Sequence, residues 1–226
     1  MKDDSLSKLG GACSILVGVA YLLMGITYLL QPAELQAGGD PTLLWPTLAQ
    51  SPPMHTLQQW AGALAGVFAI AAVLAISEVV RPANEGWVRW TSALAYLGYA
   101  VLAISSFRAL ALAPTLAEAY MTGDASTQAA IVVAGSFVDL EPQGWLGFGA
   151  TGLWMFVVNL LALGRGTWPK TLAYVGIAGG IFSCFVVGGM VLGIPLLIAI
   201  AGALGGVIVA PIWFIWMGLR LRQANL

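Results

Sequence analysis

Charged residues are scarce in this sequence, and their scarcity excludes most classes of soluble protein. Asp, Glu, Lys and Arg make up 8% of the 226 residues, whereas apolar residues make up 59%. A soluble domain typically has about a quarter of its residues charged. The net charge of −1 also argues against a nucleic-acid-binding protein, because such a protein needs a basic surface. We therefore expect a single membrane domain over residues 1–226, with no nucleic-acid partner.

The sequence has a single histidine, no lysine within a predicted span and none of the common catalytic motifs, which restricts the cofactors that it can hold. The one histidine, His55, excludes a bis-histidine haem within one chain and a histidine-rich zinc site. No lysine falls within a predicted span, so a retinal-type Schiff base has no attachment point. HExxH, GxSxG, Walker and dinucleotide-binding patterns are absent. We expect no cofactor, no metal site and no catalytic residue, which favours a protein that is not an enzyme.

Six long apolar runs make up most of the sequence. They cover approximately residues 9–30, 58–80, 87–113, 144–163, 171–192 and 195–219. Each run is close to the ~20 residues that a helix needs to cross a bilayer. The mean hydropathy of +0.88 agrees with a chain that lies mostly in lipid. The sequence therefore predicts an all-α fold, an integral membrane six-helix bundle.

Basic residues mark one side of the membrane. They flank the first and last runs and occupy the second and fourth connections, at Lys2, Lys8, Arg81, Arg89, Arg165, Lys170, Arg220 and Arg222. The long first and third connections, 31–57 and 114–143, contain no Lys or Arg. Because cytoplasmic loops carry an excess of Lys and Arg, we predict cytoplasmic N and C termini in a multi-pass protein of the cell (inner) membrane.

The two outer connections differ in character. Prolines exclude a long helix from 31–57, although Leu43, Leu44 and Trp45 can still lie on the membrane surface. In 114–143 we predict a short amphipathic helix from Thr127 to about Val138, capped by Ser126 and lying flat against the outer face.

Small residues form stripes at helical spacing. The clearest stripe, in the first run, contains Gly11, Ser14, Gly18, Tyr21, Gly25 and Tyr28. Similar glycines occur in later runs at Gly62, Gly66, Gly176, Gly180, Gly188, Gly202 and Gly206. Small residues let transmembrane helices approach closely, so we interpret the stripes as packing faces; a narrow pore or cofactor groove is the alternative. Pro211 predicts a kink in the last helix.

Arg108 is the one basic residue that falls near the outer interface. Its possible partners on that side are Glu118, Asp139 and Glu141. One interpretation is an arginine–carboxylate clamp, most simply with Asp139 or Glu141, that holds the outer helix to the third span. The other is a site for an anion or a lipid headgroup.

Polar side chains within the spans supply the remaining candidates. Tyr96 and Tyr99 share a face of the third span, where they either line a cavity or pack in the bundle. Asn159 is expected to make an interhelical hydrogen bond. Glu78 is expected to pair with Arg81 or Arg89 at the helix end rather than to carry protons.

Several stretches resemble a known family. They are Leu116-Ala117-Glu118-Ala119-Tyr120, the small-residue helix after Asp124, Gly144-Trp145-Leu146, and Trp168-Pro169-Lys170-Thr171-Leu172-Ala173-Tyr174-Val175-Gly176. This pattern is similar to a family of uncharacterised bacterial multi-pass membrane proteins, classed as a domain of unknown function. The resemblance implies a topology and no catalytic residue.

Taken together, these features favour a non-enzymatic membrane protein that binds a lipid, a small apolar ligand or a partner membrane protein, including another copy of itself. The alternative is a small transporter or channel, which needs a polar path from Asn159 to the face with Tyr96 and Tyr99. A lipid-modifying enzyme is the third possibility, and it needs acidic residues that converge on Arg108.

Overall fold

The computed structural model describes residues 4–36, 41–50, 52–135, 140–141 and 143–223, and every element within them is helical. Six helical segments are long and apolar enough to cross a membrane, as the sequence predicts. The spans are α1 (Asp4–Leu30), α3 (Pro53–Val80), α4 (Glu85–Thr122), a π-helical turn (Trp145–Ala150) with α6 (Thr151–Arg165), α7 (Lys170–Leu192), and α8 (Pro195–Ala201) joined to α9 (Ala210–Gln223) by a π-helical segment (Gly202–Val209). Shorter helices are two 3-10 turns (Ala33–Leu35 and Arg81–Ala83), α2 (Pro41–Ala49) and α5 (Ala125–Gly135).

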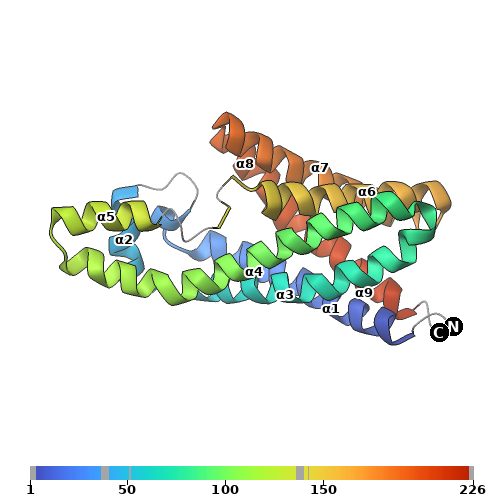
Figure 1. Ribbon diagram of the computed structural model, residues 1–226, viewed down its shortest axis with the longest axis horizontal. Helices are drawn as coiled ribbons and strands as arrows, with labels where there is room; N and C mark the ends of the chain where they lie inside the picture. Colours follow the sequence, from blue (N-terminus) through green and yellow to red (C-terminus); the bar gives the residue numbers. More distant parts are fainter. Residues whose placement is uncertain (1–3, 37–40, 51, 136–139, 142, 224–226) are drawn as a thin grey trace.

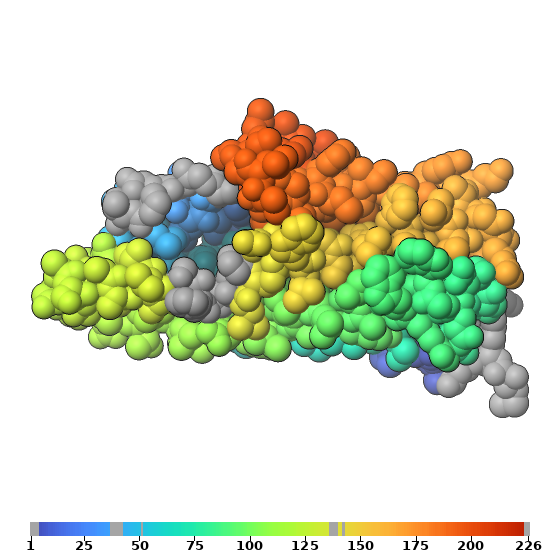
Figure 2. Space-filling view, turned by 45° about the horizontal axis from the view of Figure 1, so that its top comes forward, coloured from blue at the N-terminus to red at the C-terminus, as the bar shows by residue number. Residues whose placement is uncertain are grey.

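The bundle is elongated, and its two ends differ (Figure 1). At the terminal end lie both chain ends, the turn between α3 and α4 and the turn between α6 and α7. At the distal end, α2, α5 and the second half of α4 extend past the hairpin of α7 and α8 (Figure 2). The 38 residues of α4 measure about 57 Å, well beyond the ~30 Å of a hydrocarbon core.

The glycine stripe of α1 packs against other helices, which confirms its predicted role. A Cβ on Gly18 would lie 2.9 Å from the carbonyl oxygen of Pro211, and a Cβ on Gly25 would meet Val207. One turn before Gly18, the Ser14 hydroxyl donates to the carbonyl of Phe214 at 2.7 Å. The first and last spans therefore approach closely enough for backbone contact.

The prediction of packing faces is wrong for three glycines. A Cβ added at Gly188, Gly202 or Gly206 would have nothing within 4 Å. In the last span Gly205 makes the close contact instead, against Phe182 of α7. The π-helical segment turns the chain differently from a regular α-helix, so spacing at 3.6 residues selects the wrong glycines there.

Pro211 sits just past that π-helical segment. Proline has no N–H and its ring crowds the preceding turn, so an α-helix must adjust before it. Here the N–H of Ala210 bonds to the carbonyl of Gly205, five residues back, instead of four. The predicted irregularity is therefore a widened turn immediately before the proline.

Two sequence predictions about the distal end are wrong. The third span continues to Thr122 through Pro114, well beyond the predicted end at residue 113. Trp45 is buried against the extension of α4, so it does not lie on the membrane surface. These corrections share a cause: a second small core, formed by Trp45, Leu48, Ala113, Ala117 and Ile131, which periodicity within one element cannot reveal.

The predicted outer helix is also shifted and differently placed. It spans Ala125–Gly135, and Val138 lies outside the described residues. The Asp124 carboxylate, not Ser126, accepts the N–H of Thr127, at 2.8 Å. The helix runs beside the end of α4 along the bundle axis rather than flat across it (Figure 1).

Candidate functional site

The hairpin of α3 and α4 brings polar residues together near the terminal end. Arg81-Pro82-Ala83 forms the turn, and the side chain of Asn84 caps α4 by accepting the N–H of Trp87 at 3.2 Å. Ser77, in the last turn of α3, and Ser92, two turns into α4, face each other across this hairpin, and their hydroxyl oxygens are 2.6 Å apart.

The serine pair rests on the aromatic core of the bundle. The indole N–H of Trp154, from α6, donates to the Ser77 hydroxyl at 3.1 Å. Trp154 is fully buried and packs edge-to-face on Trp213 of α9 at 5.9 Å between ring centroids. The two serines are therefore held by hydrogen bonds on one side and by a packed core beneath.

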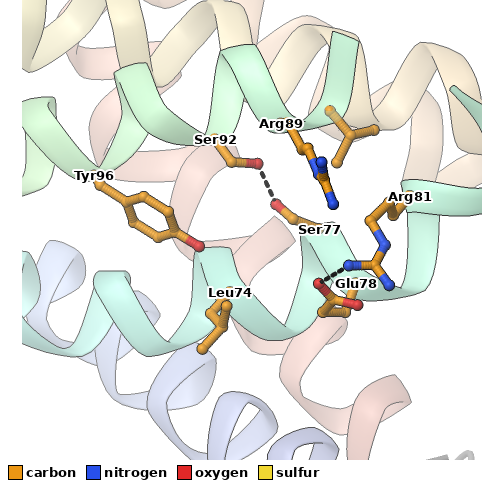
Figure 3. Close-up of a pocket in the computed structure, with 8 residues that line it drawn as sticks. Leu74, Ser77, Glu78, Arg81, Arg89, Ser92 and Tyr96 are labelled. Carbon is orange, nitrogen blue, oxygen red and sulfur yellow. Dashed lines mark hydrogen bonds and ion pairs between the residues drawn. The ribbon is translucent and has the colours of Figure 1, made fainter. Parts of the chain in front are cut away.

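Above the serines lies a small open cavity of about 130 Å³. Its lining residues are Leu74, Ser77, Glu78 and Arg81 from the α3 side, and Val88, Arg89, Ser92 and Tyr96 from α4. In the view of Figure 3, Tyr96 and Arg89 lie on opposite sides of the serine pair, and the ion pair of Glu78 and Arg81 lies beside it. We call this cavity the hairpin pocket.

Charges around the hairpin pocket alternate in sign. Arg81 Nη1 lies 2.9 Å from Glu78 Oε1, which confirms the predicted helix-end pair. Arg89 Nη2 lies 2.8 Å from Glu85 Oε1, one turn into α4. Both pairs are substantially exposed, so they stabilise the fold little and can exchange partners with a ligand.

Aromatic and apolar side chains flank the hairpin pocket. Trp87 and Trp90, in the first two turns of α4, are about half exposed and pack edge-to-face on each other at 5.5 Å between ring centroids. Tryptophan is enriched where a membrane meets water, because its ring is apolar and its N–H is polar. Away from the turn, Leu74, Ile70 and Val67 form an exposed apolar stripe on α3 at helical spacing. The polar pocket and this apolar stripe are therefore adjacent.

The residues predicted near Arg108 do not gather into one site among those described. Arg108 is half-buried on α4. Glu118 is exposed and forms no ion pair with a described residue. Glu141 accepts the N–H groups of Leu146 at 2.9 Å and Gly147 at 3.5 Å, so it caps the fourth span. Asp139 lies outside the described residues, and its pairing with Arg108 stays a prediction.

The predicted tyrosine face divides into two environments. Tyr96 reaches the hairpin pocket. Tyr99 is buried among aromatic rings, with Trp154 and Phe214 each 6.5 Å away between centroids. Tyr96 and Tyr99 are therefore only three positions apart on α4, but Tyr96 lines the pocket and Tyr99 belongs to the core.

Asn159 makes the interhelical hydrogen bond that the sequence predicts. Its amide nitrogen donates to the carbonyl of Met155 at 2.7 Å, and its amide oxygen accepts the indole N–H of Trp213 at 3.0 Å. The side chain is fully buried, and a Cβ on Gly176 would overlap it. Asn159 is therefore bonded within the buried core, whereas Tyr96 lines the hairpin pocket.

Ser77, Ser92 and Arg89 were not among the predicted site residues. Serine within an apolar run is common and carries no signal by itself. The available signal was the three- and four-residue spacing of Glu78, Arg81, Glu85 and Arg89. Within the described ranges, no group of three His, Cys, Asp or Glu side chains is placed to hold a metal ion.

A comparison with family models identifies the relatives of this membrane bundle. Residues 16–218 match the model described as domain of unknown function DUF4386. The chain belongs to this family. The match covers four of the six apolar segments in full and most of the first and the last. Searches of curated proteins and of solved structures gave no match to the chain.

Proposed function

We propose that this DUF4386 protein binds a membrane phospholipid in the hairpin pocket. One observation carries the proposal: two arginines and three hydroxyls line a cavity beside an exposed apolar stripe. Arginine forks bind phosphate oxygens, and basic pockets between transmembrane helices are suited to lipid headgroups. Lipid chains would lie along Leu74 and Ile70.

The positive-inside pattern supports a cytoplasmic location for this site. Arg81 and Arg89 share the terminal end with Lys8, Arg165, Lys170, Arg220 and Arg222. On this assignment the bound lipid comes from the cytoplasmic leaflet of the cell membrane. The protein then acts by holding a lipid, and it needs neither a cofactor nor a catalytic residue.

Lipid retention through purification tests the proposal. Wild-type protein extracted in mild detergent should keep phospholipid, measured by phosphorus analysis and native mass spectrometry. Arg81→Gln with Arg89→Gln should weaken binding. A hydrogen bond to a charged group contributes about 1.5 kcal/mol or more, so the combined loss should exceed roughly tenfold in affinity.

Arg220→Gln is the matched control, because Arg220 is an exposed arginine at the same end but outside the hairpin pocket. It should retain phospholipid like the wild type. Equal retention by the double variant and the wild type would refute lipid binding at this pocket.

A further inference from the structure

The charge pattern of the hairpin pocket points to one headgroup class. We infer that the pocket selects a zwitterionic phosphoethanolamine headgroup, with the phosphate on Arg81 and Arg89 and the primary ammonium on Glu78. This inference rests on the proposed lipid binding and adds the identity of the headgroup. Its basis is that Glu78, Arg81, Glu85 and Arg89 sum to zero charge in two pairs.

A neutral cluster discriminates against a purely anionic ligand. An anion that binds Arg81 or Arg89 must lie close to Glu78 or Glu85, and like charges at short range repel. A zwitterion avoids this penalty because its ammonium lies beside the acid while its phosphate lies beside the base. The alternation of charges along α3 and α4 therefore matches a ligand that also carries both signs.

Arg81 and Arg89 each have N–H donors that their ion pairs do not use. A guanidinium has five N–H donors, and the ion pairs of Arg81 and Arg89 each place one terminal nitrogen on a carboxylate. The remaining N–H groups can bind phosphate without breaking the pairs. Glu78 likewise uses Oε1 for Arg81, which leaves Oε2 for an ammonium N–H.

Hydroxyl groups at the base of the pocket supply further donors. Ser77 accepts from Trp154, and Ser77 and Ser92 share one hydrogen bond. Two hydroxyl protons are present in this pair and one is used between the oxygens, so the other is available to a ligand. The Tyr96 hydroxyl faces the same space (Figure 3). These donors suit the phosphate and ester oxygens of a glycerophospholipid.

The same features disfavour a choline headgroup. A quaternary ammonium has no N–H to donate to Glu78, and its recognition generally uses several aromatic rings around the cation. Tyr96 is the one aromatic residue that lines the hairpin pocket.

Native mass spectrometry with matched lipids tests the inference. Purified full-length protein is delipidated and titrated with phosphatidylethanolamine, phosphatidylcholine and phosphatidylglycerol of identical acyl chains. We expect phosphatidylethanolamine to bind roughly tenfold more tightly than either of the others, the ratio for one charge-assisted hydrogen bond.

Glu78→Gln provides the decisive variant. Removal of the acid should abolish the preference for phosphatidylethanolamine over phosphatidylcholine and raise the affinity for phosphatidylglycerol, since the pocket then carries a net positive charge. Glu118→Gln is the matched control, because Glu118 is an exposed acid at the distal end; it should leave all three affinities unchanged. Circular dichroism and gel filtration of each variant report folding, and Glu78→Asp should keep the wild-type order of lipids.

The outcomes separate this inference from the proposed function. If Arg81→Gln with Arg89→Gln weakens all three lipids but Glu78→Gln keeps the preference for phosphatidylethanolamine, the headgroup assignment is wrong and the lipid site stands. Tighter binding of phosphatidylglycerol to the wild type would also overturn the assignment. If the arginine variant binds every lipid normally, the lipid site itself is wrong.

Discussion

At the scale of single residues, Asn159 shows how one amide fixes the register of three helices. It accepts from Trp213 of α9, donates within α6, and fills the space left by Gly176 of α7. A buried polar group is costly without a partner, so this arrangement penalises any shift that separates the amide from the indole. Gly176 is required because any larger side chain would displace the amide.

Asn159→Leu should lower stability because it leaves the buried indole N–H of Trp213 without an acceptor. Such a loss costs about 1–3 kcal/mol in soluble proteins, and hydrogen bonds between membrane helices average about 0.6 kcal/mol. Thermal unfolding in detergent of both single variants and of Asn159→Leu with Trp213→Phe would form a double-mutant cycle. Strictly additive effects would show that the hydrogen bond contributes nothing.

Gly18→Leu should loosen the contact between α1 and α9, because its Cβ would meet both Ile215 and the backbone of Pro211. Overpacking of this kind costs about 1–3 kcal/mol. We expect a thermal midpoint several degrees lower in detergent. Gly202→Leu is the matched control, since it faces open space on the last span. Equal midpoints for the two variants would argue against backbone contact between α1 and α9.

At the scale of elements, α5 depends on its cap more than on its amphipathicity. Asp124 accepts N–H groups at the start of the helix, and these hydrogen bonds hold the pKa of its carboxyl below the ordinary value. The side chain of Gln128 reinforces this start by donating to the carbonyl of Tyr120, at the end of α4. The connection between α4 and α5 is therefore fixed by a few polar contacts at one turn.

Lower pH should weaken α5. A depressed pKa means that the carboxylate stabilises the folded form above its ordinary pKa and loses this effect as pH falls through the lowered value. Hydrogen exchange at Thr127 and Gln128, corrected for intrinsic rates, should show less protection near pH 3 than near pH 6. Asp124→Ala should lose protection at both values of pH, whereas Ser126→Ala should not. Unchanged protection in Asp124→Ala would mean that packing alone maintains the helix.

At the scale of the whole molecule, much of the fold could be predicted from composition and periodicity. Six apolar runs of sufficient length require six spans, and glycines at helical spacing in α1 identify its buried face. The distal end could not be predicted, since burial of Trp45 depends on Ala117 and Ile131 from two other elements. The hairpin pocket could not be predicted for the same reason, because Ser77 and Ser92 come from two helices and meet only when the turn brings these helices together.

The orientation in the membrane can be tested by labelling. The charge pattern predicts that the distal end is outside, so Gln36→Cys and Ser126→Cys, in a background without Cys13 and Cys184, should react with an impermeant thiol reagent in intact cells. Gln223→Cys, at the terminal end, should react only after permeabilisation. The reverse pattern would invert the topology and place the hairpin pocket in the outer leaflet.

The contact between α1 and α9 has a consequence for how the protein is made. The partners of the glycine face of α1 and of the Ser14 hydroxyl are in the last span, up to 200 residues later in the chain, and these take roughly 10–40 s to make at ordinary rates of synthesis. During that interval α1 is in the bilayer with a face that fits no lipid well. A newly made chain that stops before α9 therefore leaves the Ser14 hydroxyl and the close contact of Gly18 without their partners.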